Sequence, residues 1–296
     1  MKARFIFNPH SGSNRRNPHL RDRAREFIAE HGWDATVVAS ERPRHATELA
    51  RQAVDEGCSL VVAIGGDGTM NEVATALVDT PACFGLIPCG SGNGLGRHLG
   101  IRRPKQGAFR TLLGTNSLAI DTGVVNGAPF FNAMGLGFEA DIAVRFSQLT
   151  RRGLPGYFRV GVPSFLAHQS EEVTVHHAGR TTQLHAFTLA IMNSDQYGND
   201  ARVAPGAKMD DGVFELVSVP RVGLLGACGM LYRLGTDTFD RVKAVTRISG
   251  SSFVVERAKP GWIHTDGEPR ALTSRLEISL KPKSLRIMVP PKGTKI

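Results

Sequence analysis

Short apolar runs alternate with amphipathic stretches along the first part of the chain. Short, mostly apolar runs at 3–7, 35–39, 60–64 and 84–87 predict strands, and the continuous apolar run at 60–64 is typical of a strand buried on both faces. Apolar residues three or four positions apart predict helices at 18–31, 43–56 and 70–78. This alternation favours an open, mostly parallel α/β sheet that binds ligands outside the C-terminal ends of its strands.

The pattern changes after residue 121. Apolar runs at 120–125 and 129–133 flank Asn126-Gly127 and predict a hairpin. Helical spacing occurs at 139–149 and 157–167, and strand-like runs with turn signals fill 171–219 and 252–280. The run at 285–289 is predicted to pair back onto the first domain. We therefore expect an α/β domain at 1–121 plus about 282–296, and a β-rich domain at 122–281.

The composition is that of a globular protein: 296 residues, of which 41% are hydrophobic and 21% charged. Lys and Arg outnumber Asp and Glu by 36 to 27, and the resulting net charge of +9 predicts an anionic partner such as nucleic acid, nucleotide phosphate or an acidic membrane. The four cysteines lack CxxC spacing and read as the reduced thiols of a cytosolic protein. The longest mostly apolar run, 222–232, is shorter than the ~20 residues that span a bilayer.

Three loops that follow predicted strands carry phosphate-binding chemistry. Residues 65–69 read Gly-Gly-Asp-Gly-Thr between a buried strand and a helix, where glycines let backbone N–H groups form an anion nest. Asp67 would repel phosphate unless Mg²⁺ or a hydroxyl lies between them. Residues 8–13 and 88–94 add hydroxyls, amides and glycines. Each loop alone is also typical of an ordinary turn, but their shared sheet edge favours a phosphate site.

A fourth segment, residues 264–269, contains Asp266 and Glu268. Two carboxylates near a nucleotide can hold Mg²⁺ and take a proton from an attacking hydroxyl. A surface β-turn is the alternative reading of this segment.

These four motifs together resemble the diacylglycerol kinase catalytic-domain family, which includes bacterial lipid kinases, sphingosine kinases and ceramide kinases. The motifs are Asn-Pro-x-Ser-Gly at 8–12, Gly-Gly-Asp-Gly-Thr at 65–69, Gly-Ser-Gly-Asn at 90–93 and Asp-Gly-Glu at 266–268. The resemblance implies an ATP-dependent lipid kinase with a nucleotide-binding α/β domain, then a sandwich-like lipid-substrate domain, and an active site in the cleft between them.

The resemblance also implies functions for individual residues. Glu268 would accept the proton of the lipid hydroxyl with Asp266 beside it, although the position of Asp67 is the favoured base in sphingosine kinases. A structural Mg²⁺ would be held by the Asp211 carboxylate and the carbonyls of Lys208 and Val213. The residues expected to contact ATP are Asn8, Pro9, His10, Ser11, Gly12, Ser13, Ser40, Gly65, Gly66, Asp67, Gly68, Thr69, Met70, Asn71, Gly90, Ser91 and Asn93.

One departure from many bacterial members concerns the acceptor. Gly94 stands where they have Asp, which looks more like the sphingosine kinase form. The segment Gly-Leu-Gly-Phe-Glu-Ala-Asp at 135–141 also resembles the sphingosine kinase form. In sphingosine kinases the Asp that matches Asp141 contacts the sphingoid head group, so Asp141 is a candidate substrate anchor. A carboxylate favoured by a helix dipole is the alternative for Asp141. Diacylglycerol, a sphingoid base, ceramide and phosphatidylglycerol all remain open as acceptors.

The basic residues are segregated in stretches without any acid, at 80–120, 142–170 and 281–296. Few aromatic residues accompany them, which favours peripheral contact with an anionic membrane over nucleic acid. Solvated faces are the alternative. We thus expect a cytoplasmic, peripherally membrane-associated enzyme, with its oligomeric state, a homodimer included, left open.

Two other functions are alternatives to a lipid kinase. The first is an NAD kinase or another small-molecule kinase, although the second Asn/Gly/Phe-rich motif of NAD kinases is not apparent and the Asp-Gly-Glu segment would be unexplained. The second is a nucleotide-binding regulator without catalysis, against which the retained carboxylates Asp67, Asp266 and Glu268 argue.

Overall fold

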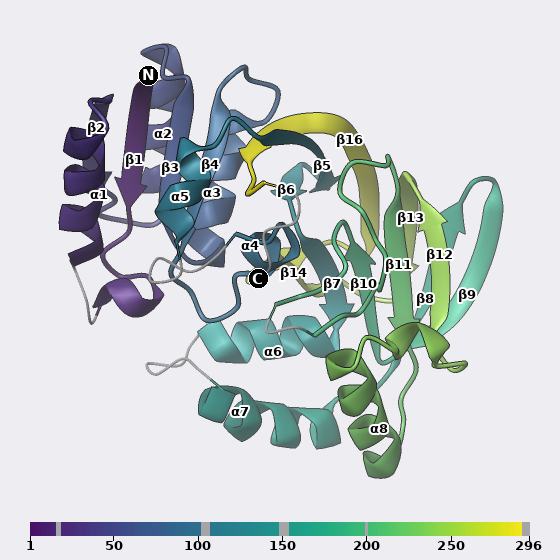
Figure 1. Ribbon diagram of the computed structural model, residues 1–296. Helices are drawn as coiled ribbons and strands as arrows, with labels where there is room; N and C mark the ends of the chain where they lie inside the picture. Colours follow the sequence, from purple (N-terminus) through teal and green to yellow (C-terminus); the bar gives the residue numbers. More distant parts are fainter. Residues whose placement is uncertain (16–18, 102–106, 148–153, 199–200, 292–296) are drawn as a thin grey trace. The chain divides into compact units, whose positions relative to one another are not determined.

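The computed structural model describes residues 1–15, 19–101, 107–147, 154–198 and 201–291 (Figure 1). The chain forms two compact units. Unit 1 comprises Met1–Asp121 and Pro282–Ile296, and unit 2 comprises Thr122–Lys281.

Unit 1 is an α/β structure built on a parallel sheet, as predicted. Its strands lie in the order β2-β1-β3-β4, and the later part of β16 extends the sheet through the parallel pair Ile287–Phe84, so the expected return of 285–289 is confirmed. All six residues of β3 are buried, as expected for a central strand. The strands are β1 (Lys2–Phe7), β2 (Asp34–Ala39), β3 (Leu60–Gly65), β4 (Cys83–Pro88) and β16 (Arg275–Met288).

Aromatic packing fixes helices onto one face of this sheet. The Phe27 ring of α1 lies 5.3 Å from the Phe109 ring of α5 and 6.4 Å from the Phe5 ring of β1. The helices of unit 1 are α1 (His19–Glu30), α2 (His45–Asp55), α3 (Asp67–Leu77), α4 (Gly94–His98) and α5 (Ala108–Leu113), with a 3₁₀ turn, η1 (Gly12–Arg15).

Helix α3 begins three residues earlier than the apolar spacing predicts. Asp67 and Gly68 belong to its first turn, and Gly66 is its N-cap. A carboxylate is favourable there because it faces the positive end of the helix dipole. The predicted helix start at Asn17 and Pro18 lies outside the described residues.

Unit 2 is an antiparallel sandwich of two sheets. One sheet has the order β12-β11-β10-β7-β14-β15, and in the other β13 pairs with β8 and with the first part of β16, while β8 pairs with β9. Phe130, Phe214 and Phe253 are fully buried in the core between them. The strands are β7 (Ala133–Gly137), β8 (Glu171–His177), β9 (Arg180–Ala186), β10 (Thr188–Met192), β11 (Phe214–Val219), β12 (Thr246–Gly250), β13 (Ser252–Arg257), β14 (Gly261–Thr265) and β15 (Glu268–Leu272).

The predicted Asn126-Gly127 hairpin is confirmed, with Val125 opposite Ala128 between β5 (Ser117–Val125) and β6 (Ala128–Phe130). The predicted strand at 129–133 is wrong, because it is divided between β6 and β7. At the break, the N–H groups of Phe131 and Asn132 donate to the Asp266 carboxylate.

Helices α6 (Phe138–Ser147), α7 (Leu154–Ala167) and α8 (Leu224–Gly235) and the 3₁₀ turn η3 (Phe239–Arg241) complete unit 2 (Figure 1). Among the described residues, no helix has both the length and the apolar character needed to cross a bilayer.

Candidate active site

The three predicted phosphate loops meet in unit 1 at the C-terminal ends of β1, β3 and β4. The Asn8 N–H donates to the Ile64 carbonyl at 3.1 Å, and the Cys89 N–H donates to the Gly65 carbonyl at 2.6 Å. These bonds continue the strand ladders into the loops, so loop order follows strand order. The edge that the strand pattern indicated is therefore the place where the loops converge.

Side chains of the first loop bind the second loop directly. Ser11 Oγ accepts the Gly66 N–H at 2.6 Å, and Asn8 Nδ2 donates to Thr69 Oγ1 at 2.8 Å. The first turn of an α-helix has N–H groups without acceptors inside the helix, which is why phosphates bind there. The first loop thus packs against the N-terminus of α3, where the sequence predicts phosphate.

Glycines are required where the loops approach each other. A Cβ on Gly12, whose φ is +45°, would lie 2.0 Å from the Cys89 carbonyl oxygen. A Cβ on Gly90 would lie 2.8 Å from the Gly66 Cα. Any side chain at these positions would therefore separate the loops.

Asp67 links the second loop to the third. Its Oδ2 accepts the Asn93 N–H at 2.9 Å, and its Oδ1 accepts the Gly94 N–H at 3.0 Å. Asn93 closes the third loop through two bonds to Gly90. The Asp67 carboxylate therefore holds two loops together, a function that the sequence did not suggest.

The remaining predicted ATP contacts differ in how accessible they are. Ser40 follows β2, its N–H donating to the Phe7 carbonyl, and its side chain is buried. Met70 and Asn71 lie inside α3 and are buried, and the Met70 side chain is part of the hydrophobic core. His10 and Ser91 are exposed, Pro9 and Gly68 are half-buried, and the Ser13 side chain lies outside the described residues.

In unit 2, the Asp-Gly-Glu motif forms a two-residue hairpin turn. Thr265 pairs with Glu268 across β14 and β15, and Asp266 and Gly267 have φ values of 51° and 84°. Such turns require positive φ at both central residues, which Asp and Gly tolerate.

Asp266 is buried and holds the segment between β6 and β7. Its carboxylate accepts the N–H groups of Asn132 at 2.7 Å, Phe131 at 3.0 Å and Ala133 at 3.1 Å. Its own N–H donates to the Ala133 carbonyl. A carboxylate bound by three N–H groups is stabilised as the anion and is a poor proton acceptor, so Asp266 positions the turn.

Glu268, by contrast, is exposed at the start of β15. In the described part of the chain, its carboxylate has no hydrogen-bond or ion-pair partner. It is therefore available to a substrate hydroxyl.

A cluster of one buried and two half-buried side chains beside this turn was missed by sequence reasoning. Glu139 Oε2 accepts a hydrogen bond from the Tyr197 hydroxyl and lies 3.3 Å from His264 Nε2. The Gly267 N–H donates to His264 Nδ1, so the imidazole proton is on Nε2 and points at Glu139. The cluster thus reaches the backbone of the turn that carries Glu268.

Burial raises the pKa of Tyr197 well above its ordinary value, and the Glu139 charge raises it further. The phenol therefore remains a donor to Glu139. A Cβ on Gly135 would lie 2.6 Å from Glu139 Oε2 and 2.7 Å from His264 Nε2, so only glycine leaves room for this contact. Glu139 lies within the 135–141 motif and His264 two residues before Asp266, but nothing in the sequence connects them.

Asp141 lies in the first turn of α6 and is paired within the protein. Its Oδ2 is 2.7 Å from His168 Nδ1, whose ring packs 5.1 Å from the Phe187 ring. This hydrogen bond, with the helix dipole, accounts for Asp141 without a ligand. Its function as a substrate anchor remains a prediction.

The predicted magnesium loop directly precedes β11. The Val213 N–H donates to Asp211 Oδ1 at 3.2 Å, and Lys208 and Asp211 are exposed. No group of three or more His, Cys, Asp or Glu side chains that could hold a metal occurs in the described ranges. A cation here would depend on one carboxylate, carbonyls and water, which is oxygen ligation of the kind Mg²⁺ accepts.

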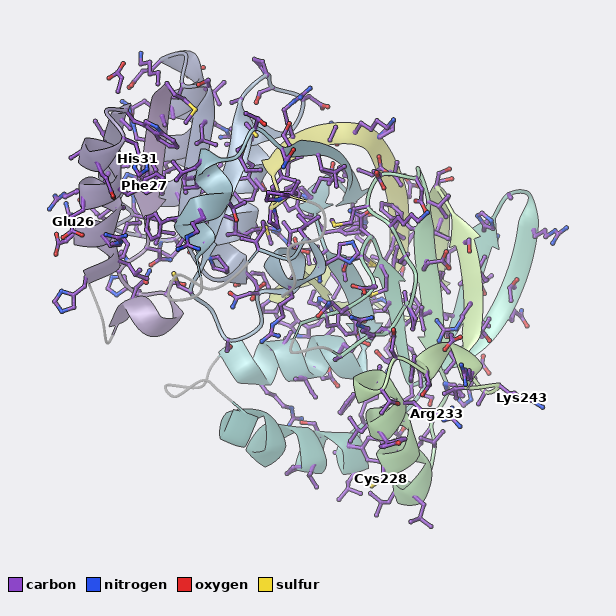
Figure 2. The ribbon with its side chains drawn as sticks, viewed as in Figure 1. Glu26, Phe27, His31, Cys228, Arg233 and Lys243 are labelled. Carbon is purple, nitrogen blue, oxygen red and sulfur yellow. The ribbon has the colours of Figure 1, made fainter. Side chains whose placement is uncertain are left out.

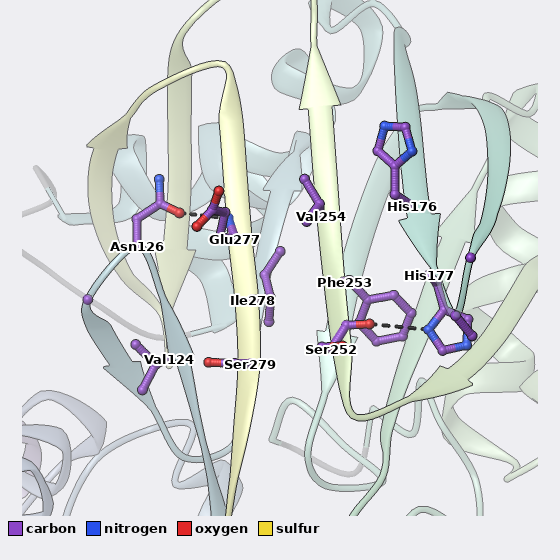
Figure 3. A pocket seen from close by; sticks show the side chains of 13 residues that line it. Val124, Asn126, His176, His177, Ser252, Phe253, Val254, Glu277, Ile278 and Ser279 are labelled. Carbon is purple, nitrogen blue, oxygen red and sulfur yellow. Dashed lines mark hydrogen bonds between the residues drawn. The ribbon is translucent and has the colours of Figure 1, made fainter.

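A hollow of about 630 Å³ in unit 2 lies elsewhere, between the β5–β6 hairpin and strands β8, β13 and β16 (Figure 3). Its polar groups are largely used within the sheet: the Glu277 N–H donates to Asn126 Oδ1, and His177 Nδ1 bonds the Ser252 carbonyl. It contains none of the predicted site residues. The candidate site therefore rests on the motif loops.

Comparison with known proteins agrees with this assignment. Residues 2–125 match the model of the diacylglycerol kinase catalytic domain, and residues 132–289 match the YegS C-terminal NAD kinase beta sandwich-like domain. A diacylglycerol kinase of Bacillus subtilis (strain 168) is 29% identical over 228 residues, 75% of each chain. One of Staphylococcus aureus (strain MRSA252) is 27% identical over 227 residues, 75% of this chain and 72% of that one.

Solved structures share the fold. The structure of a diacylglycerol kinase from Bacillus anthracis str. Sterne aligns over 98% of this chain and 97% of that chain with a TM-score of 0.73 at 17% identity. Another structure from that organism aligns over the same shares with a TM-score of 0.80 at 20% identity. With both domain models matched in order along nearly all of its length, the chain belongs to the diacylglycerol kinase catalytic-domain family and is a lipid kinase homologue.

Proposed function

We propose that this protein transfers the γ-phosphoryl group of ATP to the hydroxyl of a lipid. The observation that carries the proposal is the convergence of three glycine-rich loops at one edge of a parallel sheet, tied together by Ser11 and Asp67. Their backbone N–H groups and the N-terminus of α3 suit phosphates. The expected position of the active site between the domains stays a prediction.

Glu268 is the proposed proton acceptor. It is exposed and unpaired among the described residues, whereas Asp67 and Asp266 each accept backbone N–H bonds. Phosphoryl transfer depends mainly on positioning and charge stabilisation, with a carboxylate orienting the attacking hydroxyl. Mg²⁺, when bound, would neutralise the phosphates, and Asp211 with the carbonyls of Lys208 and Val213 would hold a structural ion.

The acceptor lipid is also part of the proposal. The curated relatives named above are diacylglycerol kinases, so diacylglycerol is the first acceptor to test. Gly94 and Asp141 match the sphingosine kinase form of their motifs, so a sphingoid base is the second acceptor to test.

The decisive experiment combines labelled ATP with diacylglycerol, a sphingoid base, ceramide, phosphatidylglycerol and NAD, and identifies the product by mass. A phosphorylated lipid is expected. Phosphorylated NAD would instead support the alternative of an NAD kinase. Binding of ATP without any product across the panel would support a nucleotide-binding regulator and refute the proposal.

We further propose peripheral contact with anionic membranes and no nucleic-acid partner. Arg110 is exposed, and many other basic residues of the three segregated stretches, such as Arg102, Arg151 and Lys292, lie outside the described residues. The protein should sediment with anionic but not zwitterionic vesicles at low salt. Equal sedimentation with both would refute an electrostatic attraction.

A further inference from the structure

Helix α8 (Leu224–Gly235) is apolar on the side that faces away from its own unit. None of its twelve residues is buried. Leu225 is 91% exposed, Tyr232 72%, Leu231 64% and Leu224 61%. On the opposite side, Met230 and Leu234 pack against the core of unit 2. A helix that is apolar all round is normally enclosed, so the outer side of α8 lacks a cover in the described chain.

Helix α7 (Leu154–Ala167) contributes to the same surface. Val162 is 54% exposed and Leu166 58%. Arg221, three residues before α8, donates to the carbonyls of Leu166 and His168 and thereby joins the end of α7 to the start of α8. We call the exposed apolar side chains of the two helices the α7–α8 face: Val162, Leu166, Leu224, Leu225, Leu231 and Tyr232.

The charged residues around the α7–α8 face favour one class of binding partner. Neither helix contains an acidic residue, and the only charged residue of α8 is Arg233. Lys243 (Figure 2) and Arg241 follow shortly after, with the exposed Asp240 directly before Arg241. Asp237 is ion-paired with Arg202 at 2.8 Å. Residues 224–243 therefore carry a net positive charge, with three basic and two acidic side chains. A second copy of the chain would oppose this charge with its own, whereas an anionic lipid surface would neutralise it.

We propose that the α7–α8 face inserts shallowly into the interface of an anionic lipid bilayer. The leucines would enter the acyl boundary, while the Tyr232 hydroxyl and the Arg233 guanidinium stay at the headgroups. The inference rests on the proposed function only in that a lipid kinase finds its acceptor in such a bilayer. Its α8 part lies outside the three segregated basic stretches, whereas α7 belongs to the stretch at 142–170.

Cys228 offers a direct test, because it is the exposed thiol of α8 (Figure 2). Cys58 and Cys89 are buried and Cys83 is half-buried. We expect vesicles of phosphatidylcholine and phosphatidylglycerol to slow its modification by a water-soluble maleimide by about tenfold, as insertion excludes water from the acyl boundary. Phosphatidylcholine vesicles should slow it far less. An unchanged rate with anionic vesicles, under conditions where the protein sediments with them, would overturn the proposal.

A double variant, Leu225→Ser with Leu231→Ser, tests the apolar contribution. Both side chains are exposed, so the fold should persist, and Leu113→Ser in α5 of unit 1, 46% exposed, is the matched control. The double variant should lose most sedimentation with anionic vesicles, and the control should keep it. If the double variant instead sediments normally but turns a dimer into a monomer, the face is a contact between copies and the proposal is wrong.

Activity separates this inference from the proposed function. The double variant should keep phosphorylation of a short-chain, water-soluble diacylglycerol and lose that of a long-chain acceptor in vesicles. Wild-type protein that phosphorylates neither of these two acceptors, nor any other lipid of the panel above, but still inserts the α7–α8 face would refute the kinase assignment while supporting the membrane inference.

Discussion

Each of the two units assembles its own group of candidate site residues, and the two units do so in different ways. In unit 1, three loops that follow neighbouring parallel strands meet through backbone groups and short polar side chains such as Ser11 and Asp67. In unit 2, a hairpin turn is held by side chains from distant parts of the chain, Glu139, Tyr197 and His264. A parallel sheet collects loops at one edge by its topology, whereas an antiparallel sandwich gathers a site only through long-range packing.

This difference has consequences for substitution. The loops of unit 1 should be sensitive to any added side chain at the close glycines, and the turn of unit 2 should be sensitive to the loss of single side chains.

The largest expected effect is in unit 2, at the exposed Glu268. Glu268→Gln should lower kcat by about 10²–10⁴ without changing the fold or ATP binding, because general base catalysis is worth that much and the side chain has no partner within the described ranges. Glu172→Gln, an exposed glutamate of β8, is the control. Steady-state kinetics and thermal denaturation check this, and near-normal activity would remove Glu268 from the mechanism.

Asp67→Asn tests whether the unit 1 carboxylate is a base or a link between loops. The amide N–H₂ would face the Asn93 or Gly94 N–H, and we expect a loss of stability of about 1–3 kcal/mol. ATP affinity should fall together with activity, which should drop about 10²-fold as the phosphate site loses its preorganisation. Calorimetric ATP titration separates the two functions, since a pure base would leave stability and ATP affinity unchanged.

Gly12→Ala tests whether the first and third loops of unit 1 need a residue without a side chain where their backbones approach. Gly32→Ala is the matched control because both glycines have positive φ, 45° and 60°, but nothing lies within 4 Å of a Cβ at Gly32. Gly12→Ala should be more destabilising by about 1–3 kcal/mol and should weaken ATP binding. Urea unfolding measures the difference, and equal losses in the two variants would argue against a steric function of Gly12.

Glu139→Gln tests the long-range cluster of unit 2. The neutral amide cannot accept from both Tyr197 and His264 at full strength, so the turn at Gly267 should lose its alignment. We expect kcat to fall about tenfold with KM for ATP unchanged, because ATP is assigned to unit 1. Kinetics at varied ATP and varied lipid would distinguish this from general unfolding, which would reduce ATP binding too. Recovery in Glu139→Asp would support a positioning function.

The smallest expected effect concerns two cysteines, one in each unit. Burial raises the pKa of the Cys89 thiol from its ordinary value of 9.0 to about 12, so thiolate at neutral pH is about a thousandfold scarcer. Cys228 is exposed on α8. Alkylation at neutral pH, followed by mass spectrometry of peptides, should therefore modify Cys228 first. Early modification of Cys89 would show that the third loop of unit 1 opens.

Most of unit 1 follows from local sequence. The apolar run of β3 and the glycine-rich residues 65–69 after it specify a buried strand and a helix N-terminus, and the α/β rule then places 8–13 and 88–94 at the same edge. What the local pattern missed was the bond from Asp67 to Asn93 and Gly94, since a carboxylate in a turn has many possible donors.

Unit 2 shows what only the tertiary structure decides. The sequence by itself determined the motifs, the parallel sheet and the presence of a β-rich second part, because these depend on periodicity and turn residues close together in the chain. It grouped Asp266 with Glu268, but the fold turns Asp266 inward to three N–H groups and leaves Glu268 in solvent. It also could not connect Glu139 to Tyr197 and His264, because hydrogen bonds across 58 and 125 residues depend on how the strands pair.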